Sequence, residues 1–216
     1  MNTDFARRQM VSQQVRAWHV FDDDVLDVFN TVPREEFVPP GYESIAFADT
    51  EIPIGHGELM MTPTIEGRVL QALGLSGGEQ VLEVGTGSGF LTACLAQLAA
   101  HVTSIDIHED FIAHAAQKLS ERKITNVQLE KMDAMAELPH GEFDAIAVTG
   151  SIENFDPRFV AALAPGGRLF VVVGEAPAMN AKIVVRTDEN DWYSESLFET
   201  ELAPLTNGSL PPQFRF

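Results

Sequence analysis

The sequence predicts an α/β protein with a largely parallel sheet, and two observations lead to this class. From residue 80 onward, short apolar runs alternate with longer amphipathic stretches, which is the pattern of βαβ units. The first run, Val81–Val84, leads directly into the glycine-rich stretch Gly85–Gly89. A strand, a glycine turn and a following helix direct free N–H groups and the positive end of a helix dipole at the turn. This arrangement suits a polar or anionic small molecule.

The first third of the chain is predicted to be largely helical. Apolar residues recur at helical spacing between residues 4 and 31, and the acidic run Asp22–Asp24 is expected to cap a second helix within this stretch. Prolines end the helical pattern between residues 32 and 40. Residues 41–63 are expected to form a long connector, of a length that is uncommon unless the loop is functional. A helix over 63–73, closed by Gly74, follows.

The remaining elements are assigned from the alternation of short apolar and longer amphipathic segments. Strands are predicted at 80–84, 102–106, 127–131, 143–148 and 167–173, and helices at 89–99, 109–122 and 154–163. Two further strands, 182–186 and 192–202, are expected to form a hairpin joined through residues 188–191. We therefore expect one domain over residues 1–216. Its N-terminal helical cap and substrate loop span 1–75, and a cofactor-binding core spans 76–216.

Composition excludes several classes of function. The formal net charge is −18, with 32 acidic against 14 basic residues, so the chain lacks the cations that bind nucleic-acid phosphates. No apolar run approaches the ~20 residues that span a bilayer. The polar N-terminus and the single cysteine, Cys94, favour a cytoplasmic protein. Cys94 lies in an apolar helical run, where a buried structural thiol is expected rather than a nucleophile.

The spacing of the glycines narrows the choice of cofactor. A dinucleotide-binding turn has the pattern G-x-G-x-x-G, but here Phe90 stands at the third glycine position and Gly89 comes one residue early. The pattern Glu83-x-Gly85-x-Gly87-x-Gly89 resembles the first motif of class I S-adenosylmethionine-dependent methyltransferases. The resemblance implies a three-layer Rossmann-like fold. Its sheet would be seven-stranded and mostly parallel, with an antiparallel C-terminal strand. The cofactor residues that it implies here are Glu83, Gly85, Thr86, Gly87, Ser88 and Gly89.

Acidic side chains at the ends of the next strands extend the expected cofactor site. Asp106 ends a predicted strand and could accept hydrogen bonds from ribose hydroxyls, although a solvated loop aspartate is the alternative. In this methyltransferase class an aspartate at the position of Asp133 commonly accepts from the adenine amine. Ile107 and Met132 could enclose the adenine ring, or could be ordinary core residues. Thr149 is expected to lie near the reactive methyl group.

Sequence blocks on both sides of the glycine turn indicate a particular family. The blocks are Met10-Val11, Gln14-Val15, Val32–Pro39, Asp49, Ile52–Gly55, Pro63, Phe143–Ile146 and Leu163-x-Pro165-Gly166-Gly167. Together they resemble the protein-L-isoaspartate O-methyltransferase family, from about residue 8 to about residue 206. The resemblance implies methyl transfer from S-adenosylmethionine to the α-carboxylate of isoaspartyl residues in damaged proteins, which starts their repair.

This chemistry places modest demands on the protein. The nucleophile is a carboxylate, which is already ionised at neutral pH, so no general base is required. The enzyme must instead hold the carboxylate oxygen in line with the sulfonium methyl group. His56 and His101 therefore need no catalytic role, and both are expected to lie in loops.

One segment departs from the family. The family pattern Gly-Gln-Thr-Ile-Ser-x-Pro falls on residues with Glu58, Leu59 and Met61 in place of Gln, Thr and Ser. A thioether cannot donate the hydrogen bond of the family's serine, which is placed near the substrate carboxylate. Thr62 or Thr64 could supply a hydroxyl from a neighbouring position.

The departure leaves three interpretations open: isoaspartyl methylation, methylation of another small-molecule or protein substrate through the same cofactor site, and a cofactor-binding protein with a degenerate substrate pocket. The resemblance predicts a peptide or small-molecule partner, with no nucleic acid and no membrane. The sequence does not predict the oligomeric state.

Overall fold

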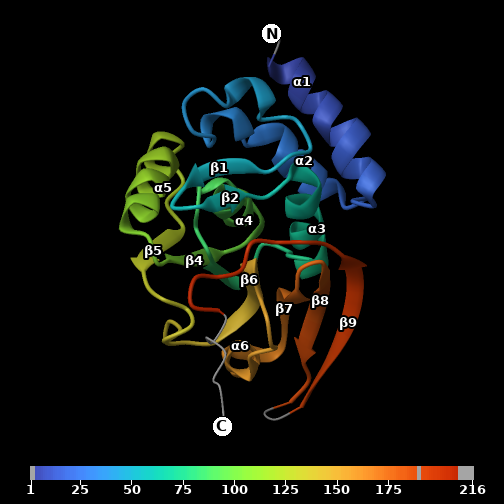
Figure 1. Cartoon of the computed structure of the whole chain (residues 1–216), viewed down its shortest axis with the longest axis vertical. Coiled ribbons are helices and arrows are strands. Elements are labelled where there is room, and N and C mark those ends of the chain that lie inside the picture. The colour runs from blue at the N-terminus through green and yellow to red at the C-terminus, as the bar shows by residue number, and fades with distance from the viewer. Residues whose placement is uncertain (1–2, 189–190, 209–216) are drawn as a thin grey trace.

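A seven-stranded sheet forms the centre of the computed structural model, which describes residues 3–188 and 191–208 (Figure 1). The strand order is β5-β4-β3-β6-β7-β8-β9. The bounds are β3 Gln80–Val84, β4 His101–Asp106, β5 Val127–Lys131, β6 Phe143–Ile152, β7 Leu163–Glu175, β8 Ala178–Arg186 and β9 Trp192–Glu199. Neighbouring strands from β5 to β7 are parallel, and β8 is antiparallel to both of its neighbours. The predicted fold class is confirmed.

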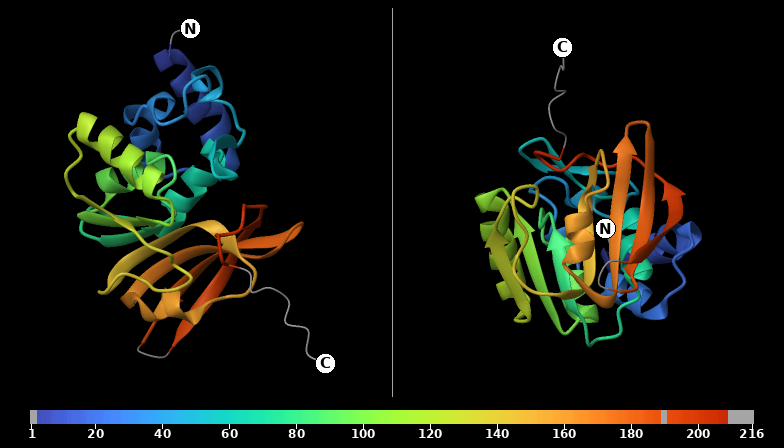
Figure 2. Two further views of the ribbon diagram at one scale, coloured as in Figure 1. Left: turned by 60° about the vertical axis from the view of Figure 1, so that its left-hand side comes forward. Right: turned by 90° about the horizontal axis from the view of Figure 1, so that it is seen from below.

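Both faces of the central strands β3 and β6 are buried, which explains why these strands consist mostly of apolar residues, whereas the edge strands β5 and β9 are more exposed. Successive residues of β3 point to opposite faces: Val81 joins one hydrophobic cluster, and Leu82 and Val84 join the other. On the first face lie α3 (Pro63–Leu73), α4 (Phe90–Leu98) and α5 (Glu109–Glu121). On the second face lies α6 (Pro157–Ala161), so helices lie on both sides of the sheet in Figure 2.

The N-terminal region is helical with one interruption that the sequence analysis placed inside a helical stretch. Helix α1 (Thr3–Met10) continues into a π-helical turn, Val11–Val15, and a 3-10 turn, Arg16–Trp18. His19 then takes a left-handed conformation (φ 64°) that ends the helical path. Helix α2 (Asp23–Thr31) begins at the predicted cap, where the Asp22 carboxylate accepts from the backbone N–H groups of residues 24 and 25.

The predicted connector over 41–63 is the largest error in the sequence-based assignment. It contains a 3-10 turn, Glu43–Ile45, and an antiparallel hairpin of β1 (Ile52–Gly55) and β2 (Glu58–Met60). These strands are only four and three residues long, so they show too little alternation for a periodicity argument. The predicted helix that follows is confirmed as α3, with Thr62 at its N-cap and Gly74 at its C-cap.

Smaller differences concern element lengths. The helix predicted over 154–163 spans only Pro157–Ala161, and β7, predicted from residue 167, already starts at Leu163. Strand β6 continues to Ile152, four residues past its predicted end. His101, expected in a loop, is the first residue of β4. The predicted hairpin of β8 and β9 is confirmed, although residues 189–190 of its turn lie outside the described part.

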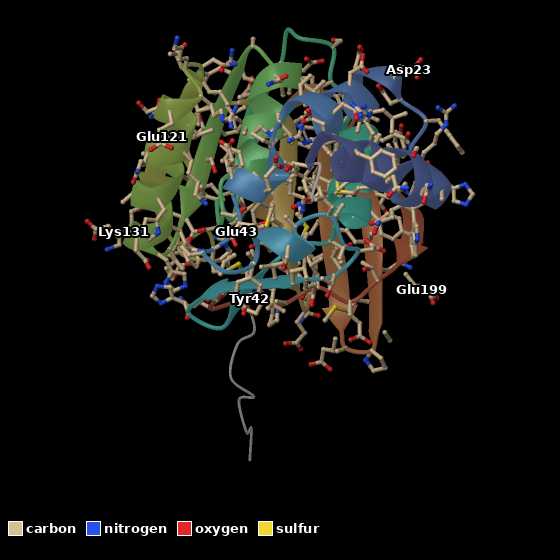
Figure 3. All side chains as sticks on the ribbon, turned by 90° about the horizontal axis from the view of Figure 1, so that it is seen from above. Asp23, Tyr42, Glu43, Glu121, Lys131 and Glu199 are labelled. Atoms are coloured by element: carbon tan, nitrogen blue, oxygen red, sulfur yellow. The ribbon has the colours of Figure 1, made fainter. Side chains whose placement is uncertain are left out.

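Acidic side chains are spread around the molecule. In Figure 3 the labelled Asp23, Glu121 and Glu199 lie at its outer edge and come from three different elements. In the described residues, no helix is long and apolar enough to cross a membrane. The cytoplasmic location stays a prediction.

Candidate active site

The glycine turn between β3 and α4 is shaped by close contacts with neighbouring elements. Gly85, Gly87 and Gly89 all have positive φ (97°, 50° and 81°). A Cβ atom on Gly85 would lie 2.2 Å from Oγ1 of Thr149, and one on Gly89 would lie 2.9 Å from Cβ of Ala115. Both positions therefore require glycine for packing as well as for backbone angle. At Gly87 the nearest atom is the tip of a flexible side chain, at 3.1 Å, on the cavity side.

Asp106 lies across this turn at the carboxyl end of β4. Its Oδ2 accepts from the backbone N–H of Gly87 at 2.9 Å, and its Oδ1 accepts from that of His108 at 2.9 Å. The residue is 7% exposed and lines the cavity described below. Each carboxylate oxygen can accept a second hydrogen bond. Asp106 can therefore hold the turn and still accept from a diol.

A cavity of about 770 Å³, partly open to solvent, lies at the carboxyl ends of the strands. It brings together eight of the residues predicted from the sequence: Met61, Gly85, Gly87, Asp106, Ile107, Met132, Asp133 and Thr149. A smaller adjoining cavity of about 340 Å³ adds Thr86 and Ser88. The carboxyl edge of a parallel sheet is where ligands bind in open α/β folds.

Three of the predicted site residues line neither cavity. Gly89 caps α4 with left-handed backbone geometry. Thr62 caps α3, and its hydroxyl lies 3.0 Å from that of Thr64, which in turn donates to Asp49. Glu83 is fully buried beneath the turn. The roles predicted for these three residues stay predictions, and their observed contacts are structural.

The side chain of Glu83 is a buried carboxyl group of which only one oxygen accepts hydrogen bonds from the described residues. Oε2 accepts from Thr92 and Ser104, each at 2.5 Å, while Oε1 has no hydrogen-bond partner among the described residues. Burial raises the pKa of Glu83 to about 8, against the opposing effect of the two hydroxyl donors. Ser104 also bonds the hydroxyl of Thr86, so Glu83 supports the turn from below.

This buried carboxyl should make stability pH-dependent. Its folded-state pKa of about 8 exceeds the ordinary glutamate value of 4.5, so between these limits the folded state holds a proton that the unfolded state releases. The free energy of unfolding should fall as pH rises through this window. Each pKa unit corresponds to about 1.4 kcal/mol. We expect Glu83→Gln to reduce this slope in urea titrations between pH 5 and 8, and Glu195→Gln, on an exposed strand, to leave it unchanged. Equal slopes in Glu83→Gln and the wild type would show that Glu83 titrates normally.

Several lining residues were missed because they come from segments with no motif. The chain after β9 turns back over the strand ends, and residues Leu202–Thr206 line the cavity (Figure 1). The Oγ1 of Thr206 donates to Glu58, and the amide of Asn207 donates to Asp133 Oδ2 at 2.8 Å. Asp133, the predicted hydrogen-bond acceptor for the adenine amine, therefore already accepts a hydrogen bond from the side-chain amide of Asn207. The sequence gives no signal for this contact because it joins positions 74 residues apart.

The Met61 side of the cavity is held by a buried arginine. Arg34 forms an ion pair with Glu66, and also donates to the backbone oxygens of Ala46 (2.9 Å) and Met61 (2.6 Å). Burial lowers the pKa of Arg34 and raises the pKa of Glu66, and the attraction between them opposes both shifts. Arg34, which belongs to the sequence block Val32–Pro39, therefore fixes the position of the Met61 backbone.

The residues present fit an S-adenosylmethionine-type ligand. Gly87 has no side chain and opens onto the cavity, and the carboxylate of Asp106, which lines the same cavity, can accept hydrogen bonds from a diol there. A doubly wound sheet with this turn at the end of its first core strand defines a class I S-adenosylmethionine-dependent methyltransferase.

Comparisons with known proteins identify the family. The family model of protein-L-isoaspartate(D-aspartate) O-methyltransferase matches residues 6–210, and the chain belongs to this family. A protein-L-isoaspartate O-methyltransferase of Rhodopseudomonas palustris is 38% identical over 94% of this chain and 84% of its own. One of Anaeromyxobacter dehalogenans is 38% identical over 94% and 99%. The resemblance inferred from the sequence blocks is confirmed.

Solved structures support the fold. A protein-L-isoaspartate O-methyltransferase of Plasmodium falciparum in complex with S-adenosyl-L-homocysteine superposes with a TM-score of 0.78, at 20% identity, over 95% of this chain and 99% of that one. A second structure of a protein-L-isoaspartate O-methyltransferase gives a TM-score of 0.79, at 21% identity, over 92% and 65%.

Proposed function

We propose that this protein transfers the methyl group of S-adenosylmethionine to the α-carboxylate of isoaspartyl residues in proteins and peptides. The observation that carries the proposal is the cavity, in which the segment around Met61 faces the glycine turn and the strand-end aspartates. Cofactor residues and family-specific residues thus share one space. Membership of the family over 6–210 supports the same substrate class.

The chemistry assigns positioning roles to this chain's residues. The cofactor supplies an electrophilic methyl group on a sulfonium. A carboxylate oxygen of the substrate forms the new O–C bond while the C–S electron pair returns to sulfur, and no proton is transferred. Gly87 leaves room for the cofactor backbone, and Asp106 accepts from its ribose. Asp133, whose Oδ2 already accepts from Asn207, would accept a second hydrogen bond from the adenine amine. Ile107 and Met132 enclose the ring.

The decisive experiment compares two peptides. We expect label from S-adenosylmethionine in a base-labile methyl ester on an isoaspartyl peptide, and none on its aspartyl twin. Equal labelling of both peptides, or of neither, would contradict the proposed substrate.

A second function is favoured by one observation, the thioether of Met61 on the cavity wall where the family places a hydroxyl. If neither peptide is labelled while S-adenosylmethionine still binds, the enzyme methylates a different carboxylate or serves only to bind cofactor. A screen of small carboxylic acids then separates these two cases.

Replacing Asp106 by alanine should weaken cofactor binding. The change leaves ribose hydroxyls unpaired, and we expect a loss of roughly 1–3 kcal/mol, or about 5- to 150-fold in Kd, by calorimetry. Asp144→Ala is the matched control, because Asp144 also accepts from a backbone N–H, that of Gln80, but at the opposite edge of the sheet. An unchanged Kd for Asp106→Ala would remove this residue from the site.

A further inference from the structure

Two histidine rings stack on each other, and one of them, His108, lines the cavity. His56 stands at the tip of the β1–β2 hairpin, in a left-handed conformation (φ 53°) between two glycines. His108 immediately precedes α5. The two rings stack with centroids 4.0 Å apart and an angle of 10° between their planes, and Phe111 packs edge-on against both.

A carboxylate completes this cluster. Nε2 of His56 lies 2.8 and 3.0 Å from the two oxygens of Asp110. One ligand-type atom from each of His56, His108 and Asp110 lies within 4.8 Å of the other two. The side chains of His56 and Asp110 are 42% and 51% exposed, so an ion from solvent can reach them. Nε2 of His108 is buried and has no hydrogen-bond partner in the described part of the chain, and a carboxylate oxygen of Glu58 lies 3.9 Å from it.

We propose that His56, His108 and Asp110 form a binding site for a divalent transition metal of the zinc class. Two imidazoles and one carboxylate are a common ligand set for such ions, with water in the fourth position. Ligand atoms around a tetrahedral ion with bonds of about 2.0–2.2 Å lie roughly 3.4 Å apart, so atoms now within 4.8 Å of one another must draw together, and the stacked rings must rotate until their lone pairs converge on the ion. The exposed side chains and the flanking glycines of the hairpin tip permit this shift. Magnesium and calcium prefer sets of oxygen ligands, whereas two of the three residues of this site are imidazoles, with Glu58 as a further carboxylate 3.9 Å from His108.

The position of the site gives the metal a consequence for the cavity. Ile54 and Leu59 of the hairpin line one side of the cavity, and Ile107 and Phe111 line the other. A metal held by His56 and His108 would fasten these two walls together. This consequence rests on the proposed function, because it concerns release of the cofactor. Metal binding itself does not rest on it.

Metal binding is tested on the full chain without cofactor. We expect calorimetric titration with zinc chloride to show one strong site per chain, and magnesium chloride to show none. His56→Asn keeps a residue that tolerates left-handed backbone, and His108→Gln removes the second ring. Each should weaken zinc binding by at least about tenfold. The control is His114→Gln, on the exposed side of the same helix, which should bind like the wild type. Equal zinc affinity in all four proteins, or no zinc binding, overturns the site.

The fastening of the walls is tested separately. Zinc should slow dissociation of S-adenosylhomocysteine from the wild type and leave the rate unchanged in His56→Asn. By linkage, an equilibrium effect of zinc on the cofactor's Kd must appear equally in the cofactor's effect on zinc. Zinc binding with unchanged cofactor release overturns the fastening and leaves the metal site in place. If the peptide assay fails, the proposed substrate is refuted, but the results on zinc binding and on cofactor release still stand.

Discussion

Replacing Gly87 with valine should abolish binding of S-adenosylmethionine while the protein still folds. Gly87 has a φ of 50°, where a β-branched residue is strongly disfavoured, and it lines both cavities at the strand ends. A Cβ atom would already lie 3.1 Å from Ile54, and the two methyl groups of valine would extend into the space that the ligand needs. Calorimetry should show no heat of binding in this variant.

The matched control for Gly87→Val is Gly77→Val. Gly77 also has a positive φ (96°), but a Cβ atom added there would have no atom within 4 Å, and the residue lies in the loop before β3. Both variants carry a backbone strain of about 1–2 kcal/mol, so they should have similar thermal midpoints. Only Gly87→Val should lose the cofactor. Normal binding by Gly87→Val would mean that the turn shapes the fold and does not contact the ligand.

Met61→Ser should raise the rate of isoaspartyl methylation. The side chain of Met61 is 7% exposed and lines both cavities, and Arg34 holds its backbone oxygen. A serine hydroxyl there could donate to the substrate carboxylate. A hydrogen bond to a charged group contributes about 1.5–3 kcal/mol, which is roughly 10- to 150-fold in kcat/KM if it forms only in the transition state.

Met61→Ala separates the hydroxyl from the space it occupies. Both substitutions remove a buried thioether and should destabilise the fold by about 2–5 kcal/mol, so rates are compared at a temperature where both variants are folded. If the methylation rate rises in Met61→Ser but not in Met61→Ala, the increase is due to the hydroxyl group. Equal gains in both variants would assign it to added room. A wild type as fast as Met61→Ser would show that backbone contacts already suffice and that methionine is tolerated.

The strands and the glycine turn were predictable because their signals are local. A strand buried on both faces needs a continuous apolar run, and a turn with positive φ needs glycine. Strand β3 and the turn Gly85–Gly89 could therefore be located from their own residues, without knowledge of the elements that pack against them. Helix α3 was equally well placed by Pro63 and Gly74, and the structure adds Thr62 as its N-cap. The β1–β2 hairpin was missed because strands this short carry no periodicity.

The candidate site was predictable only where it follows strand ends. In a parallel sheet, Asp106 and Asp133 must reach the same edge as the glycine turn, and the cavity does contain all three. Thr62 and Glu83 were also predicted from the motifs, but their side chains cap a helix and support the turn, outside the cavity lining. Motif position does not reveal which way a neighbouring side chain points.

The sequence by itself determined the fold class, the family and the edge of the sheet where the cofactor should bind, since each is encoded in consecutive residues. Tertiary structure alone decided which distant residues meet there. Thr149 closes against Gly85, Asn207 pairs with Asp133, and His56 stacks on His108. The physical reason is that such contacts depend on how the hairpin and the C-terminal segment fold back over the sheet. No local propensity or periodicity carries that information.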